Sequence, residues 1–157
     1  MIQAEKRFME SAIQEALKSK KLGDYAIGAV IVKEDKILSV GINRVKLDND
    51  PMAHAEVTAI RNAVKIIGNR HLENSILYST HEPCIMCCGV AYFSRISGII
   101  YGSTREDMKN YSSKNGNNEW SWLPSPISCR EVFNKADREI SIVGEFMREE
   151  CKKLFHS

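Results

Sequence analysis

The sequence predicts an α/β fold, a three-layer α/β/α sandwich built on a mixed sheet of about five strands. Segments with apolar residues at helical spacing alternate along the chain with short runs of β-branched residues. A short polar turn separates the first two runs, which indicates an antiparallel hairpin. Helices connect the later runs, which should therefore lie parallel. A chain of 157 residues is long enough to form this fold as one domain, residues 1–157.

The first part of the chain begins with an amphipathic helix over residues 1–20, where apolar side chains recur at helical spacing. Residues 27–32 and 36–41 form the predicted hairpin. A polar loop over residues 43–52 follows. Residues 53–67 carry an apolar stripe on one side, which predicts a second helix.

The second part continues the alternation, but one long segment interrupts it. Residues 103–128 are polar and contain glycine and proline, so we expect a long irregular excursion. Segments of this length without secondary structure are usually functional or disordered. The other predicted elements are strands at residues 75–80, 96–101 and 140–143, and helices at residues 84–93, 129–135 and 145–155.

Composition and charge exclude several classes of protein. The net charge is only +2, which argues against extensive neutralisation of phosphates but not against a local basic patch. No apolar run approaches the roughly 18 residues of a membrane span, so we expect no membrane partner. The amino-terminal segment lacks the apolar centre of a signal peptide, and the five cysteines are an odd number. We therefore expect a cytoplasmic protein without disulfides.

The most informative motif combines H-A-E at residues 54–56 with P-C-I-M-C at residues 83–87. His54, Cys84 and Cys87 supply three nitrogen or sulfur ligands for Zn²⁺, one fewer than a closed structural site has. A water molecule in the open position would have its pKa lowered toward neutrality. Glu56 is a carboxylate close to the first ligand, where it can move the protons of that water. The motif therefore predicts a catalytic zinc site with Glu56 as the catalytic acid and base.

A closed structural zinc site is the main alternative, and it needs a fourth protein ligand. Cys88 follows Cys87 directly, so on a helix its side chain should point about 100° away. His81 lies at the end of a predicted strand, within reach of Cys84. With either ligand the protein would be a non-catalytic, zinc-stabilised binding module, and Glu56 would have no role.

At these residues the sequence resembles the cytidine-deaminase-like superfamily of zinc enzymes, which carry H-x-E followed by P-C-x-x-C. The similarity is to the branch that contains guanine deaminases, fungal cytosine deaminases and tRNA adenosine deaminases. It covers most of the chain and fades after Gly102. Residues 49–51 and 54–61 look most like guanine deaminases, whereas the closing strand and helix are also similar to the tRNA enzymes.

The resemblance implies hydrolytic deamination of a nucleobase or nucleoside with release of ammonia, and guanine is the favoured substrate. The tRNA enzymes usually have a proline in place of Ile27 and a leucine in place of His81, so editing of tRNA adenosine to inosine is the second choice. A cytosine or cytidine substrate is a third. The implied partners are a small-molecule substrate and a second copy of the chain in a homodimer, which meets its partner through helices near the active site.

Four residues are candidates for contacting the substrate. The resemblance implies that Asn43 hydrogen-bonds the substrate and that the backbone N–H of Ala55 donates to the base. From the residues alone, Asn43 is equally a turn residue at the end of the hairpin. Trp120 and Trp122, in the polar excursion, either stack on a base or fill a surface groove or a subunit contact.

Overall fold

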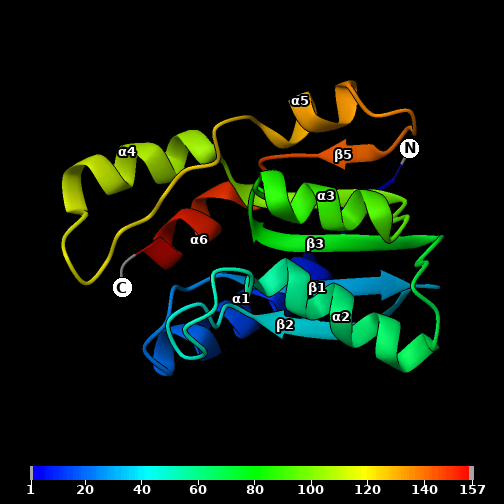
Figure 1. Ribbon diagram of the computed structural model, residues 1–157, viewed down its shortest axis with the longest axis horizontal. Helices are drawn as coiled ribbons and strands as arrows, with labels where there is room; N and C mark the ends of the chain where they lie inside the picture. Colours follow the sequence, from blue (N-terminus) through cyan, green and yellow to red (C-terminus); the bar gives the residue numbers. More distant parts are fainter. Residues whose placement is uncertain (1, 156–157) are drawn as a thin grey trace.

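The computed structural model describes residues 2–155 and confirms the predicted α/β sandwich with its mixed sheet. Five strands form one sheet in the order β2-β1-β3-β4-β5 (Figure 1). The strands are β1 (Gly28–Lys33), β2 (Lys36–Ile42), β3 (Ser75–His81), β4 (Gly98–Ser103) and β5 (Ser141–Val143). The helices are α1 (Lys6–Lys21), α2 (Ala55–Ile67), α3 (Ile85–Phe93), α4 (Arg105–Asn115), α5 (Cys129–Asn134) and α6 (Arg148–Lys152), with a 3₁₀ turn, η1 (Lys153–Phe155).

The directions of the strands follow from their connections. β1 pairs antiparallel with β2, as the predicted hairpin requires, and antiparallel with β3 on its other side. β3, β4 and β5 lie parallel to one another, because a helix connects each to the next. The parallel arrangement predicted for the later strands is therefore confirmed.

Helices cover both faces of the sheet. α2, α3 and α5 pack on one face, and α1 and α6 pack on the other (Figure 1). The alternation of side chains along β1 shows how one strand serves both layers. Ala29 and Ile31 belong to the core under α2 and α3, whereas Val30 and Val32 belong to the core under α1.

A glycine in β2 allows α2 to approach the sheet closely. A Cβ atom on Gly41 would lie 2.3 Å from the backbone oxygen of Ala55, in the first turn of α2. No side chain fits in that space, so the helix backbone rests directly on the strand. This contact places the first turn of α2, with its neighbours His54 and Glu56, against the sheet.

The expectation of an irregular excursion over residues 103–128 is wrong for its first half, which forms α4. Thr104 accepts a hydrogen bond from the backbone N–H of Asp107, and the Asp107 side chain accepts one from the N–H of Thr104. This capping box starts a helix that has few apolar residues, which is why apolar periodicity did not reveal it. Residues 116–128 contain no helix or strand, as expected.

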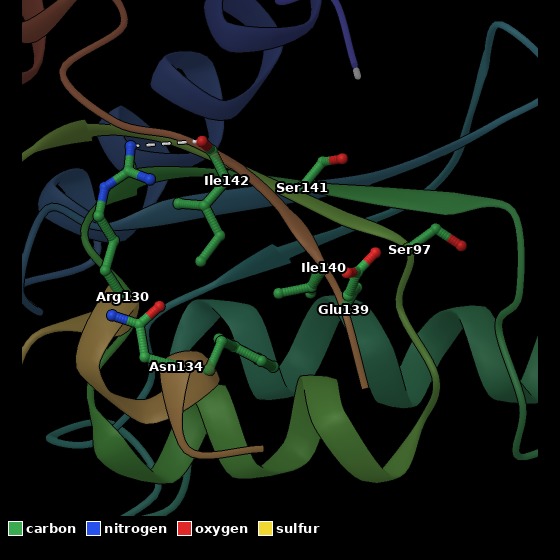
Figure 2. Close-up of a pocket in the computed structure, with 8 residues that line it drawn as sticks. Ser97, Arg130, Asn134, Glu139, Ile140, Ser141 and Ile142 are labelled. Atoms are coloured by element: carbon green, nitrogen blue, oxygen red, sulfur yellow. Dashed lines mark hydrogen bonds between the residues drawn. The ribbon is translucent and has the colours of Figure 1, made fainter. Parts of the chain in front are cut away.

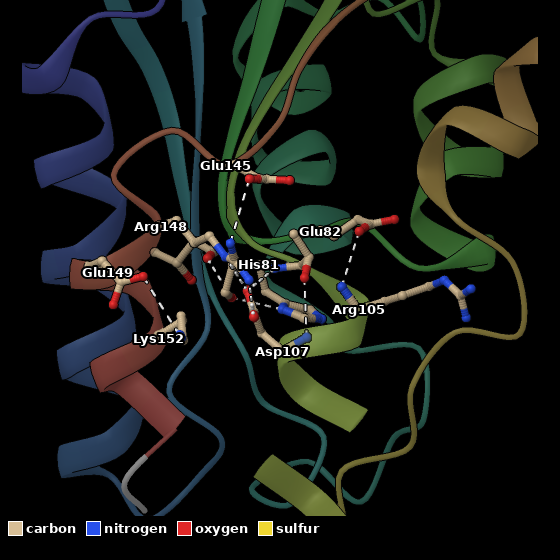
Figure 3. Close-up of polar contacts among 11 residues, drawn as sticks. His81, Glu82, Arg105, Asp107, Glu145, Arg148, Glu149 and Lys152 are labelled. Carbon is tan, nitrogen blue, oxygen red and sulfur yellow. Dashed lines mark hydrogen bonds and ion pairs between the residues drawn. The ribbon is translucent and has the colours of Figure 1, made fainter. Parts of the chain in front are cut away.

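An ion pair fastens α4 to the end of the chain (Figure 3). Arg148, the first residue of α6, donates two hydrogen bonds, of 2.9 and 2.7 Å, to the carboxylate of Asp107. The predicted helix over residues 145–155 begins only at Arg148, because Glu145 and Met147 have positive φ angles of 62° and 53°. That backbone conformation is incompatible with a right-handed helix.

Two sequence-based exclusions can be compared with the structure. Within residues 2–155 no helix combines the length and the apolar character needed to cross a bilayer. All five cysteines are free thiols in this structure.

Candidate active site

The three predicted metal ligands meet at the starts of two helices. His54 is the N-cap of α2, Cys84 is the N-cap of α3, and Cys87 lies in the first turn of α3. Their ligand atoms all lie within 4.8 Å of one another. Cys84 Sγ is 3.7 Å from Cys87 Sγ, and His54 Nδ1 lies 3.6 and 3.5 Å from the two sulfurs.

These distances fit a tetrahedral zinc ion. Bonds of about 2.3 Å to sulfur and about 2.05 Å to nitrogen separate two sulfurs by about 3.8 Å, and sulfur from nitrogen by about 3.6 Å. A hydrogen bond with the Cys87 thiol, together with the neighbouring His54, lowers the pKa of Cys84 to about 4. The donor set is therefore one imidazole and two thiols, one of them readily ionised, which suits Zn²⁺.

Neither candidate for a fourth ligand reaches this cluster. The Cys88 thiol points away and donates to the backbone oxygen of Pro83 at 3.3 Å. His81 Nδ1 lies 2.9 Å from the hydroxyl of Ser103, and burial lowers the pKa of its imidazole to about 4. Among residues 2–155, the metal-binding cluster holds three protein ligands, as an open site requires.

Glu56 lies beside the ligand cluster and is almost completely buried. Ser79, on β3, donates a 2.9 Å hydrogen bond to Glu56 Oε1. The other carboxylate oxygen, Oε2, is 3.5 Å from Cys87 Sγ. Burial raises the pKa of Glu56, which brings this carboxyl group closer to the range in which it can both accept and release a proton near neutrality.

A cavity of about 450 Å³ opens over His54 and Cys84. Asn43 and Trp122, two of the four predicted substrate-binding residues, line it. Ala55, the third, is the first residue of α2, and the N–H groups of that turn have no partner within the helix. The remaining lining residues are mostly apolar and are Tyr25, Ile27, Val45, Pro51, Ile85, Met108, Ser121, Leu123, Pro124, Ser125 and Pro126.

One wall of this cavity is the irregular segment over residues 121–126, which Tyr25 holds in place. The Tyr25 hydroxyl donates to the backbone oxygen of Ser121 at 3.0 Å and accepts from its N–H at 2.9 Å. The rings of Trp120 and Trp122 both pack against Tyr25, at 5.1 and 5.7 Å between centroids. Trp120, the fourth predicted residue, does not line the cavity, and Lys46 Nζ lies 3.8 Å from its ring centroid.

A second cavity, of about 490 Å³, lies between α5 and the edge strand β5 (Figure 2). Arg130, Asn134 and Glu139 are among its lining residues, and the Arg130 guanidinium donates to the backbone oxygen of Ile142 at 3.3 Å. It shares no lining residue with the cavity at the metal cluster. The chemistry-bearing residues thus belong to the first cavity.

Three residues of the site escaped the sequence analysis. Asp24 holds Asn43, Tyr25 holds the wall formed by residues 121–126, and Ser79 holds Glu56. Asp24 and Tyr25 lie between a predicted helix and a predicted strand, so their sequence position indicates only an ordinary loop. Ser79 lies within the strand predicted at residues 75–80, and a polar residue inside a buried strand was the one available signal.

The sequence match identifies the family to which this constellation belongs. Residues 2–103, which include all three ligands and Glu56, match the cytidine and deoxycytidylate deaminase zinc-binding region. The chain belongs to this family. It is a zinc-dependent deaminase whose metal site is formed by His54, Cys84 and Cys87.

The curated relatives include both tRNA-specific adenosine deaminases and a guanine deaminase. A tRNA-specific adenosine deaminase of Buchnera aphidicola subsp. Baizongia pistaciae is 37% identical over 159 residues, which cover 100% of this chain and 89% of that protein. A guanine deaminase of Bacillus subtilis is 49% identical over 80 residues, which cover 51% of each chain.

The similar solved structures also include both kinds of enzyme. A structure from a study of A-to-I editing by tRNA:A34 deaminases superposes with a TM-score of 0.76 at 26% identity, over 96% of this chain and 99% of that chain. The Bacillus subtilis guanine deaminase superposes with a TM-score of 0.65 at 31% identity, over 87% and 98%.

Proposed function

We propose that this deaminase converts adenosine to inosine in tRNA. The observation that carries the proposal is the end-to-end similarity to tRNA-specific adenosine deaminases, 37% over the whole chain and 33% over 94% of it. These alignments extend through most or all of the chain, including the part that forms the wall of the cavity. In this family the residues around the base, rather than the zinc ligands, decide the substrate.

The reaction replaces an exocyclic amine by an oxygen atom from water. His54, Cys84 and Cys87 would hold zinc with one open position, where it would lower the pKa of a water molecule and so supply the nucleophile. Glu56 accepts a proton from that water and transfers it to the adjacent ring nitrogen. It then passes the second proton to the amine, which leaves as ammonia. The hydrogen bond from Ser79 to Oε1 orients the carboxylate and leaves Oε2 on the side of the metal ligands.

The cavity is suited to a base that has been turned out of a strand. Its volume of about 450 Å³ and largely apolar lining offer room for a flat base next to His54 and Cys84. Trp122 is the aromatic side chain on which that base would stack. Asn43 and the N–H of Ala55 would read its edge.

Guanine, favoured by the sequence analysis, is the second candidate. Its support is the 49% identity to the Bacillus subtilis guanine deaminase, which exceeds the identity to the tRNA enzymes. That similarity covers only half of each chain, whereas the tRNA enzyme aligns throughout. We therefore favour adenosine in tRNA as the substrate over free guanine.

A substrate panel tests the choice. The zinc-loaded enzyme is incubated with a tRNA anticodon stem-loop that carries adenosine at the wobble position, and separately with guanine, guanosine, adenosine, cytosine and cytidine. We expect inosine in the RNA, and we expect its formation to slow steeply as salt rises, because RNA binding depends on phosphate contacts. Ammonia from guanine, with no inosine in the stem-loop, would overturn the proposal.

A further inference from the structure

Asp24 is a fully buried carboxylate that accepts hydrogen bonds on both of its oxygens. Oδ1 accepts from the backbone N–H of Tyr25 at 2.8 Å and from Asn43 Nδ2 at 2.9 Å. Oδ2 accepts from the backbone N–H groups of Lys46 and Leu47, at 2.9 and 3.0 Å. Four donors thus converge on one carboxylate, and two of them belong to Tyr25 and Asn43, which line the cavity.

This arrangement determines which way the Asn43 amide is turned. The oxygen and nitrogen of an asparagine side chain are similar in shape, so a flipped amide would fit the same space. A carboxylate that already accepts from every side offers no proton to an amide oxygen, so the NH₂ group must face Asp24. The amide oxygen, Oδ1, and one N–H remain for other partners.

The backbone of Asn43 is held as well. Its N–H donates to the backbone oxygen of Ile27 at 3.1 Å, and its carbonyl oxygen accepts from the Ser19 hydroxyl at 2.6 Å. Asn43 is 3% exposed, and it lines the cavity that contains His54 and Cys84. A side chain with both ends of its backbone and one end of its amide fixed is preorganised for recognition.

We propose that Asp24 is a positioning residue, which holds Asn43 with its amide oxygen and one N–H free to bind the substrate base. The inference rests on one part of the proposed function, namely that Asn43 contacts the substrate base. It holds for whichever base the enzyme deaminates. Without the carboxylate the amide can rotate or flip, and a large share of its encounters with the base then become unproductive.

Asp24 also anchors Lys46 and Leu47, so the test must separate positioning from loop stability. The Asp24→Asn variant keeps the size of the side chain and removes an acceptor. We expect it to retain zinc and to lower kcat/KM by roughly tenfold to a hundredfold, since hydrogen bonds to charged groups are among the stronger ones. Asp48→Asn is the matched control, because Asp48 lies in the same loop and binds Arg44 instead.

A double-mutant cycle with Asn43→Ala decides whether Asp24 acts through Asn43. If it does, Asp24→Asn costs little further activity once Asn43 is alanine, so the two effects are far from additive. A loop-stability role alone predicts that the two losses multiply, and that result would overturn the inference. The cycle can be measured with any substrate of the panel that the wild-type enzyme converts. The panel alone tests the proposed substrate, so a wrong substrate does not affect the test of Asp24.

Nuclear magnetic resonance supplies a readout that needs no turnover. The Asn43 side-chain NH₂ signal, assigned by its loss in Asn43→Asp, should shift in Asp24→Asn, where its acceptor becomes a neutral amide oxygen or is lost, and should be unchanged in Asp48→Asn. An unchanged Asn43 signal in Asp24→Asn would contradict a fixed orientation. Both measurements use the full-length, zinc-loaded protein.

Discussion

Ser79 on β3 donates a 2.9 Å hydrogen bond to one carboxylate oxygen of Glu56 at the start of α2. The other oxygen lies 3.5 Å from Cys87 Sγ, at the start of α3. The central sheet therefore holds one oxygen of Glu56, while the other remains beside the metal ligands. Through this hydrogen bond the sheet helps to set the position of the proposed proton carrier.

Glu56→Gln should keep zinc and lose most deamination. Glutamine has the size of glutamate and can still accept from Ser79, but it cannot carry a proton. The loss of general acid and base catalysis is typically worth about 10²–10⁴-fold in kcat. Zinc content and ammonia release are measured on the same sample, with the exposed Glu73→Gln as the control. Turnover close to that of the wild type would show that Glu56 is not the proton carrier.

The ligand assignment predicts a clear contrast among four variants. His54→Ala, Cys84→Ala and Cys87→Ala should each bind less than one equivalent of zinc and be inactive, because two protein ligands hold the ion poorly. Cys88→Ala should keep both zinc and activity, because the Cys88 thiol bonds to Pro83 rather than facing the cluster. Zinc stoichiometry of the purified variants decides the point. Loss of metal from Cys88→Ala would mean that the site is closed.

Trp122 should contribute to substrate binding more than Trp120 does. Trp122 lines the cavity, whereas Trp120 is not among the lining residues and stacks on Trp122 instead. Stacking of a base on an aromatic ring is worth about 1–3 kcal/mol, so Trp122→Ala should raise KM by roughly fivefold to a hundredfold. Trp122→Phe should retain most of the affinity. Because Trp122 also packs against Met108 and Phe155, thermal unfolding of each variant is recorded alongside the kinetics.

The ion pair of Asp107 with Arg148 predicts an acid-sensitive contribution to stability. Burial disfavours the ionised form of Asp107, but hydrogen bonds from Arg148 and Thr104 outweigh it and lower the pKa of Asp107 to about 2. A lowered pKa in the folded state adds stability that is fully present above the ordinary aspartate pKa of about 3.9. That contribution disappears as the pH falls from about 4 to about 2.

Asp107→Asn should consequently lower the Tm at neutral pH by about 2–4 °C, and the difference from the wild type should shrink as the pH falls below about 4. Thermal unfolding measured between pH 7 and pH 2 tests this. Asp35→Asn, at an exposed position on the hairpin turn, serves as the control. A difference in Tm that stays constant down to pH 2 would contradict the assigned role of the ion pair.

The homodimer expected from the resemblance remains a prediction, and the surface of α3 is consistent with it. Ile85 and Phe93, at the two ends of this helix, are 48% and 78% exposed. Apolar side chains at such exposure are candidates for a contact surface. Light scattering should give about twice the chain mass of 17.8 kDa, and Phe93→Asp should reduce it. A monomer at all working concentrations would be evidence against the dimer.

Much of the fold and the metal centre could be predicted from local patterns. Apolar periodicity located α1, α2 and α3, and the chemistry of a histidine with a C-x-x-C pair indicated zinc. The pattern failed at α4, where a capping box starts a helix without an apolar stripe. It also set the start of the last helix too early, because positive φ angles at Glu145 and Met147 are settled by packing.

The sequence by itself indicated the reaction centre, because three ligands and a carboxylate lie in two short motifs whose residue types are those of a zinc site. Only the tertiary structure decided what surrounds that centre. Asp24 meets Asn43 across 19 positions, Ser79 meets Glu56 across 23, and Tyr25 meets Ser121 across 96. No periodicity links such partners, since their hydrogen bonds depend on which strands and loops the folded sheet brings together. The substrate cavity is formed by these long-range contacts, which is why the sequence predicts the chemistry more sharply than the base.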